Sequence, residues 1–174
     1  MMAIDMDMLR ARVARFKDLK SSSEAFVDTR IPEYNREIFN VIGRGVTEDP
    51  RLQPAIADAR DFHLTFMKSD PGKGSSLHDH ETIECFVPLT GKWAIVLGDD
   101  GANEIILEQF DTFSVPPGVM RAVKNAGTDP GVILTILGGT DPGRVTWSKS
   151  INEKAKALGL VVDDNGDLVR LSGA

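Results

Sequence analysis

The feature that most constrains the fold is a series of short segments in which apolar and polar side chains alternate. After Asp61, the residues Phe62, Leu64 and Phe66 occupy every second position, which is typical of a strand with two different faces. Six more segments of strand length follow, at residues 77–87, 92–97, 104–107, 113–115, 121–124 and 132–137. Because turn-forming residues separate them at intervals of about 8–12 residues, the pattern predicts an all-β antiparallel barrel or double-sheet jelly roll.

Residues 1–60 precede this series and are predicted to form an arm. Leu9, Val13 and Phe16 recur at helical spacing, so a short helix is expected at the start of the chain. From residue 24 to residue 60, prolines interrupt the apolar side chains. This pattern indicates helical turns and an extended arm that packs on a larger body.

Residues 141–174 follow the strands and are predicted to contain a helix and a tail. Ser150 and Glu153 have the spacing of a capping box at a helix N-terminus, and residues 161–169 are typical of a final hairpin. We therefore expect one structural domain overall, with the N-terminal helix and arm at 1–60, the barrel at 61–140 and the C-terminal helix and tail at 141–174.

The charge balance and the cysteine content exclude several classes of protein. The 174 residues include 20 Lys and Arg against 26 Asp and Glu, a net charge of −6, which argues against binding to nucleic acid or to an anionic membrane. The single cysteine, Cys85, excludes an internal disulfide and a Cys-rich zinc module. The N-terminal residues are acidic where a signal peptide needs an apolar run, so we expect a cytoplasmic protein.

Two of the three histidines of the chain lie in the predicted strand at residues 77–87. His78, His80 and Glu84 share one face of such a strand, because side chains alternate between its two faces. Two imidazoles and one carboxylate form a ligand set that suits a divalent transition metal. The other interpretation of the same pattern is a polar strand face that is exposed to solvent.

The residues around this cluster form a motif. A glycine, five residues, His-x-His, three residues, a glutamate, six residues and a second glycine follow one another in the order Gly72, His78, His80, Glu84 and Gly91. In this motif the chain resembles the cupin superfamily, and it is most similar to small single-domain bacterial cupins. The resemblance covers about residues 61–138 and implies a double-stranded β-helix. It also implies a metal held by His78, His80 and Glu84.

The second cupin motif is only partly present. Pro116, Gly118 and Asn125 match it, but Phe110 stands at its glycine position and Arg121 at its histidine position. In metal-binding cupins this second histidine usually completes the metal shell. A guanidinium group cannot replace it, because it stays protonated and offers no free lone pair.

Arg121 leaves two alternatives for the site. In the first, His78, His80 and Glu84 hold the metal and Arg121 binds an anionic substrate, most simply a carboxylate. In the second, Arg121 neutralises Glu84 and the pocket binds a small anion without a metal. His63 is a further candidate ligand, although a place at the barrel rim is expected for it. Glu81 enters the site only if a bulge changes the strand parity.

The main functional hypothesis is a metal-dependent enzyme that acts on a small oxygen-bearing substrate. The metal would be iron, manganese, nickel or zinc, and Arg121 and Glu84 would be its catalytic residues. The ligand set favours oxygenase-type chemistry over an isomerase or lyase reaction. The alternative is a non-catalytic module that binds a small anion. A homodimer is expected from the resemblance, and its partner would cover the apolar residues 26–42.

Overall fold

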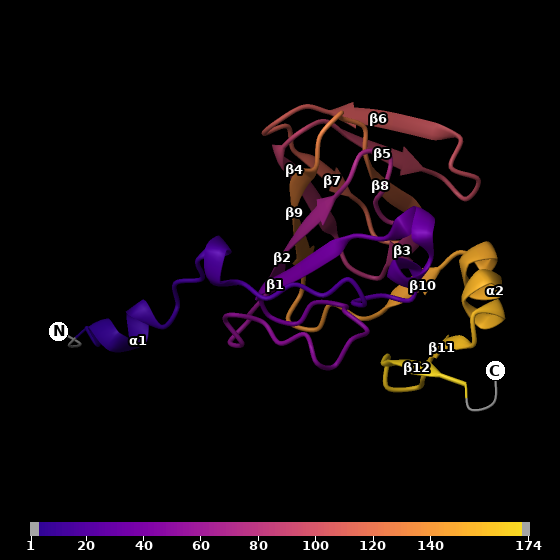
Figure 1. The fold of residues 1–174 in the computed structure, drawn as a ribbon. Coiled ribbons are helices and arrows are strands. Elements are labelled where there is room, and N and C mark those ends of the chain that lie inside the picture. Colours follow the sequence, from indigo (N-terminus) through magenta and orange to yellow (C-terminus); the bar gives the residue numbers. More distant parts are fainter. Residues whose placement is uncertain (1–3, 172–174) are drawn as a thin grey trace.

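Two five-stranded antiparallel sheets form the barrel in a computed structural model that describes residues 4–171 (Figure 1). The first sheet has the order β1 (Glu37–Ile42), β2 (Phe62–Ser69), β9 (Gly131–Gly138), β4 (Glu84–Thr90) and β7 (Phe113–Val115). The second has the order β10 (Val145–Trp147), β3 (His78–His80), β8 (Arg121–Asn125), β5 (Trp93–Leu97) and β6 (Asn103–Leu107). The predicted all-β class and the double-stranded β-helix are therefore confirmed.

The core lies between the two sheets, where alternate residues of each strand point inward. Met67 on β2 pairs in register with Ile133 on β9, and both side chains are buried together with Ile95 and Val123 of the opposite sheet. This packing follows from the period-two pattern of the sequence, since one face of each strand is apolar and must be removed from water.

The segment predicted as one strand at 77–87 is two strands that belong to different sheets. β3 pairs with β10 and β8, whereas β4 pairs with β9 and β7. Residues 81–83 form the corner, and there the amide of Gly138 donates to the carbonyl oxygen of Ile83. The prediction of a continuous strand is wrong because the chain must change sheets here to close the barrel.

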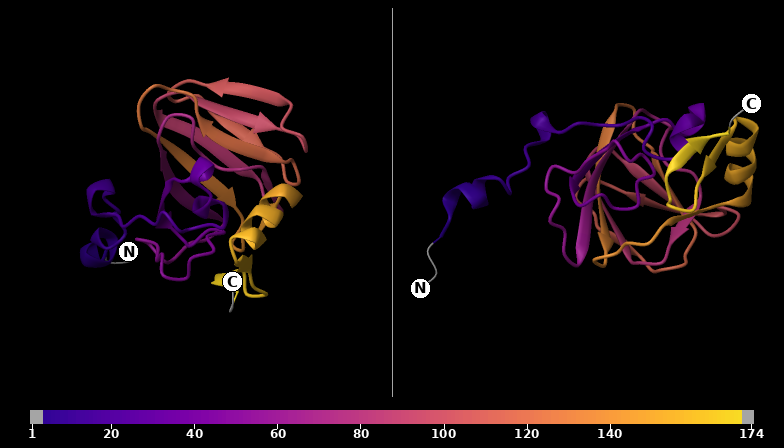
Figure 2. Two further views of the ribbon diagram at one scale, coloured as in Figure 1. Left: turned by 45° about the vertical axis from the view of Figure 1, so that its right-hand side comes forward. Right: turned by 90° about the horizontal axis from the view of Figure 1, so that it is seen from below.

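The N-terminal helix is shorter than its apolar periodicity suggested. Helix α1 spans Met6–Arg10, buries none of its residues, and is followed by a single 3₁₀ turn, η1 (Phe16–Asp18). Figures 1 and 2 show this part of the chain extending away from the barrel. A helix with no surface to pack against gains little from its apolar face, and short isolated helices are marginal in water.

The arm that follows packs on its own barrel. It contains two 3₁₀ turns, η2 (Asp28–Arg30) and η3 (Pro32–Tyr34), and then β1, which the sequence did not predict. Strand β1 shows no alternation because both of its faces are covered: Ile38 lies in the core, and the Phe39 ring lies 5.3 Å from that of Phe16. The apolar residues 26–42 thus have a place to pack within one chain.

The C-terminal segment also packs against the arm. Helix α2 spans Lys149–Ala157, and its Ile151 and Ala155 are buried with Val27 and Ile31. The predicted capping box is wrong, because Ser148 is the N-cap and no side chain caps the helix. The final hairpin is confirmed as β11 (Leu160–Val162) paired with β12 (Leu168–Arg170). Among residues 4–171, no helix is long and apolar enough to cross a bilayer.

Candidate metal centre

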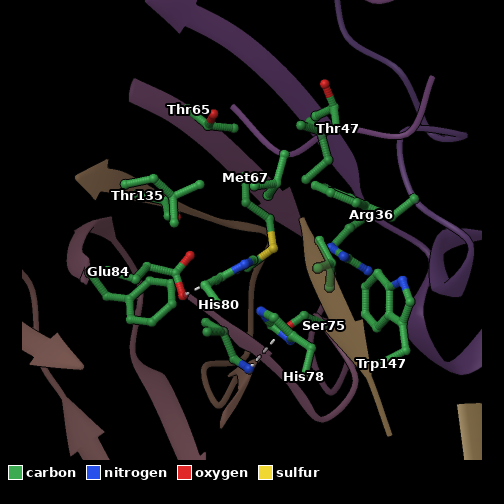
Figure 3. Close-up of a pocket in the computed structure, with 17 residues that line it drawn as sticks. Arg36, Thr47, Thr65, Met67, Ser75, His78, His80, Glu84, Thr135 and Trp147 are labelled. Atoms are coloured by element: carbon green, nitrogen blue, oxygen red, sulfur yellow. Dashed lines mark hydrogen bonds and ion pairs between the residues drawn. The ribbon is translucent and has the colours of Figure 1, made fainter. Parts of the chain in front are cut away.

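The structure brings His78, His80 and Glu84 together although they come from two sheets. One ligand atom from each of the three side chains lies within 4.8 Å of the others, and all three residues are buried (Figure 3). The corner at residues 81–83 turns β4 so that the carboxylate of Glu84 faces the imidazoles of β3. The Nε2 atom of His80 lies 3.7 Å from Oε2 of Glu84.

Backbone carbonyl groups fix the orientation of both imidazole rings. The Nδ1 atom of His78 lies 2.7 Å from the carbonyl oxygen of Ser76, and that of His80 lies 3.5 Å from the carbonyl oxygen of Arg144. A carbonyl oxygen can only accept, so Nδ1 is the protonated nitrogen in each ring. Each Nε2 therefore keeps a free lone pair, as a metal ligand requires.

Burial keeps both histidines neutral. It is the main cause that lowers the pKa of His78 well below its usual range, and the nearby His80 and Arg121 add to the effect. Burial also lowers the pKa of His80 to about 3, again with a contribution from Arg121. Neutral imidazole is the form that binds metal, so neither ring has to lose a proton first.

Burial and the neighbouring Arg121 act on the pKa of Glu84 in opposite directions. Burial raises its pKa to about 7, while Arg121 acts in the opposite direction. The Nε–H of Arg121 donates to Oε2 of Glu84 at 2.9 Å, and its Nη1 donates to the carbonyl oxygen of Val119 at 3.0 Å. Oε1 of Glu84 accepts no hydrogen bond from residues 4–171, so one carboxylate oxygen is free to bind a cation.

Arg121 lies behind Glu84 rather than in the cavity. It is 0% exposed, and it is placed on β8 directly opposite His78 of β3. The cavity itself has a volume of about 60 Å³. By the same measure one water molecule occupies about 10–15 Å³, so the space suits a metal ion and a ligand of a few non-hydrogen atoms. Besides the three candidate ligands, the lining includes Phe26, Arg36, Thr47, Thr65, Met67, Ser75, Phe86, Thr135 and Trp147.

His63 and Glu81 lie outside the cavity. The Nδ1 atom of His63 accepts from the amide of Gly45 at 3.2 Å, and its Nε2 donates to the carbonyl oxygen of Thr140 at 3.2 Å. Both ring nitrogens are therefore used by the barrel rim. Glu81 is exposed at the corner between β3 and β4 and faces Gly143.

Arg36 and Trp147 line the cavity, and the sequence pattern did not point to either. Arg36 lies just before β1, and its Nη2 forms an ion pair with Oδ1 of Asp28 at 2.9 Å. Trp147 lies on β10, with its ring centroid 5.4 Å from that of His78. Both residues come from outside the two cupin motifs, so motif spacing could not identify them. The only hint in the sequence was that position 147 is a tryptophan, because large aromatic residues commonly form cavity walls.

The residues of the second motif have structural roles around the site. Gly118 has φ = +72°, and its amide donates to the carbonyl oxygen of His80 at 3.0 Å, which fixes the end of β3. Asn125 is buried and donates to the carbonyl oxygens of Ser69 and Asp129. Phe110, at the glycine position, has φ = +70°, a left-handed conformation that glycine adopts more readily than other residues.

Residues 65–137 match the family model of the Cupin domain. No curated protein matches the chain. Several solved structures share the fold of this chain.

A structure described as the DMSP lyases RdDddP and RnDddQII has a TM-score of 0.57 and 16% identity, over 75% of this chain and 63% of that chain. The chain thus spans less than two thirds of that lyase. A cupin 2 domain-containing protein from Halorhodospira halophila has a TM-score of 0.53 and 19% identity, over 70% of this chain and 77% of the other.

The formate complex of oxalate decarboxylase from Lactobacillus farciminis has a TM-score of 0.53 and 16% identity, over 78% of this chain and 35% of that one. At these identities the comparisons establish the architecture alone. Together with the sheet topology, they show that residues 65–137 match the Cupin domain within a double-stranded β-helix fold.

Proposed function

We propose that this chain binds a divalent transition metal through His78, His80 and Glu84 and acts on a small oxygen-bearing substrate. The observation that carries the proposal is that two neutral imidazoles direct free Nε2 atoms toward one carboxylate in a buried cavity. These nitrogen and oxygen donors suit iron, manganese, nickel or zinc. Once bound, such a metal would polarise a substrate oxygen or activate dioxygen.

The cavity favours a small carboxylate as the substrate. Its volume of about 60 Å³ admits only a few non-hydrogen atoms. Arg36 lines it, and the buried Nε–H of this residue has no protein partner among residues 4–171. A carboxylate oxygen is a strong acceptor for such a charged donor. The oxalate decarboxylase of similar fold was solved with formate, the smallest carboxylate.

The three ligands are compatible with two types of reaction. The two-His, one-carboxylate set favours oxygenase chemistry, whereas the DMSP lyase and oxalate decarboxylase of similar fold are a lyase and a decarboxylase by name. Dioxygen uptake by the iron-loaded protein in the presence of small keto acids separates the two. We expect uptake, and turnover without uptake would favour the lyase or decarboxylase class.

Metal analysis of protein purified without a histidine tag tests the metal itself. We expect about one equivalent of Fe(II), Mn(II), Ni(II) or Zn(II) after reconstitution, and loss of this metal in the variant His78→Ala/His80→Ala. The matched control is His63→Ala, because His63 is a buried histidine outside the cavity. Wild-type protein that takes up no metal, or a double variant that retains it, would overturn the proposal.

A second candidate function is a metal-free module that binds a small anion. The contact of 2.9 Å between Arg121 and Glu84 favours it, because Arg121 then supplies the positive charge beside the carboxylate. In that case formate would bind to the metal-free protein, and added metal would not change its affinity. Formate titrations with and without Zn(II) distinguish the two functions.

A further inference from the structure

Two buried carboxylates from outside residues 65–137 support the part of the cavity around His78. Asp28 belongs to η2 and is 0% exposed, and Glu48 follows β1 and is also buried. Neither side chain touches the candidate ligands directly. Each of them holds a residue that does contact His78, namely Ser76 for Asp28 and Trp147 for Glu48.

Asp28 fixes Ser76 through two hydrogen bonds. Its Oδ2 accepts from the backbone amide of Ser76 at 2.9 Å and from the Ser76 hydroxyl at 3.0 Å. The carbonyl oxygen of Ser76 in turn accepts from Nδ1–H of His78 at 2.7 Å. Because Asp28 fixes the amide and the side chain of Ser76, it also fixes the position of this carbonyl, which can then select one tautomer and one ring orientation of His78.

Asp28 is itself held in place by Arg36. The Nη2 of Arg36 lies 2.9 Å from Oδ1 of Asp28. The Nη1 of Arg36 donates to the carbonyl oxygens of Tyr34 and Gly74. A buried ion pair adds little net stability compared with apolar residues of the same volume, because both charges lose their hydration. Its effect here is geometric, since it fixes the carboxylate that orients residue 76.

Trp147 supports the same histidine from another side. Its ring lies 5.4 Å from that of His78, and its Nε1–H donates to Oε1 of Glu48 at 2.7 Å. The other oxygen of Glu48 accepts from the amide of Val27 at 2.5 Å. The arm therefore determines both the hydrogen bond to Nδ1 and the aromatic wall beside the ring.

We propose that Asp28 is a positioning residue for the metal centre: by holding Ser76, it keeps His78 protonated on Nδ1 and directs its Nε2 into the cavity. This inference rests on the proposed function for its consequence, which is metal affinity. The tautomer itself is a property of the metal-free protein and can be measured separately.

The test is the substitution Asp28→Asn, which preserves the shape of the side chain and removes its charge. We expect Co(II) affinity, measured by absorption titration, to fall about 10–100-fold, as is typical when the hydrogen-bond partner of a ligating histidine is lost. In the metal-free protein, ¹⁵N NMR should show His78 protonated on Nδ1 in the wild type and a mixture of tautomers in the variant.

The matched control is Asp49→Asn. Asp49 is also a buried aspartate of the arm that accepts from a serine hydroxyl, that of Ser22 at 3.0 Å, but it does not line the cavity. This variant should keep the wild-type affinity and tautomer. Equal losses in both variants, or an Asp28→Asn protein with the wild-type tautomer and an affinity within twofold of the wild type, would overturn the proposal.

Ser76→Ala is the alternative test variant if the Asp28→Asn protein does not fold. It removes one of the two hydrogen bonds to Asp28, so a smaller loss of Co(II) affinity and a minor second tautomer are expected, and wild-type behaviour would contradict the inference. If the wild-type protein binds no Co(II), the proposed function fails. The tautomer of His78 in the variants still decides whether Asp28 positions it.

Discussion

Arg121 is the residue that most opposes the proposed binding of a metal. It replaces the histidine of the second cupin motif, and a guanidinium group cannot be a ligand. Its Nε–H donates to Oε2 of Glu84 at 2.9 Å, so it competes with a metal for that oxygen. It also places a fixed positive charge in a buried site, where Coulomb repulsion of a cation is only weakly screened.

The variant Arg121→His should therefore bind metal more tightly than the wild type. It removes the fixed charge and offers an imidazole in its place, so we expect Co(II) affinity to rise about tenfold or more, given that an outer-shell change alone is worth about 10–100-fold. The control Arg121→Gln, which removes the charge and adds no ligand, should show a smaller rise. A folded Arg121→His protein with weaker Co(II) binding would contradict this expectation.

Glu48 should make the stability of the protein depend on pH. Burial raises its pKa from 4.5 to about 7, against hydrogen bonds from Trp147 and Val27 that lower it. The unfolded chain thus loses its proton at a lower pH than the folded one. This contribution to the free energy of unfolding is full below pH 4.5 and declines by about 3 kcal/mol as the pH rises to 7.

Urea denaturation of Glu48→Gln at pH 4.5 and pH 7.5 measures this effect. The variant has no ionisable group at this position, so its stability relative to the wild type should improve by about 3 kcal/mol between the two values. Glu104→Gln on the exposed strand β6 is the control, and its free energy of unfolding should equal that of the wild type at both pH values. A constant difference between Glu48→Gln and the wild type would show that Glu48 is ionised in the folded protein.

Among the elements, the sequence predicted the strands of the barrel well and the arm poorly. The sequence pattern located β2, β5, β6, β7, β8 and β9, and each of these strands contributes at least one buried residue to the core. It did not detect β1, whose central residues are all buried. A strand covered on both faces has no period of two, and its partner Phe16 lies too far away in the sequence to be anticipated.

The candidate ligands could be predicted although their strand could not. His78, His80 and Glu84 were placed on one face by the alternation of a single strand, but a corner separates β3 from β4. The corner preserves the inward direction of Glu84 because β4 resumes the alternation in the opposite sheet. The supporting contacts from Asp28, Arg36 and Trp147 depend on the tertiary path of the arm, which local sequence does not encode.

Substitution of Phe110 should relieve backbone strain in the turn before β7. This residue has φ = +70° and is 68% exposed, so it bears the cost of a left-handed conformation and gains little from packing. Phe110→Asn should raise the free energy of unfolding by about 0.5–1 kcal/mol, whereas Phe110→Val should lower it by about 1 kcal/mol. Urea denaturation midpoints measure both, and the opposite order would contradict the argument.

At the scale of the whole molecule, the N-terminal segment makes few contacts with the rest of residues 4–171: helix α1 buries none of its residues, and the contacts include an ion pair of Arg12 with Asp58 and the packing of Phe16 on Phe39. Its apolar side chains at positions 4, 6, 8, 9, 13 and 16 are 42–73% exposed, and Figure 2 shows the segment extending away from the barrel. Residues 26–42 pack on their own barrel, so they no longer support the expected homodimer. The exposed N-terminal segment supports it instead.

Sedimentation velocity over a range of concentrations tests this homodimer. We expect the wild type to sediment as a dimer at micromolar concentration, and Leu9→Asp/Val13→Asp to sediment as a monomer, because buried carboxylates would oppose the contact. Ile105→Asp/Ile106→Asp, on the exposed strand β6, is the matched control and should remain dimeric. A monomeric wild type, or dissociation of the control alone, would contradict this expectation.

The contact between Asp28 and Ser76 has a consequence for recombination, because it joins residues inside and outside the matched cupin domain. Ser76 and all three candidate ligands lie within residues 65–137, but Asp28 lies 37 residues before the start of that range. Recombination that transferred residues 65–137 alone would carry all three candidate ligands and leave behind the aspartate that we propose aligns one of them. If Asp28 positions His78 as proposed, the inheritable unit of the candidate centre is longer than the matched domain and includes the arm.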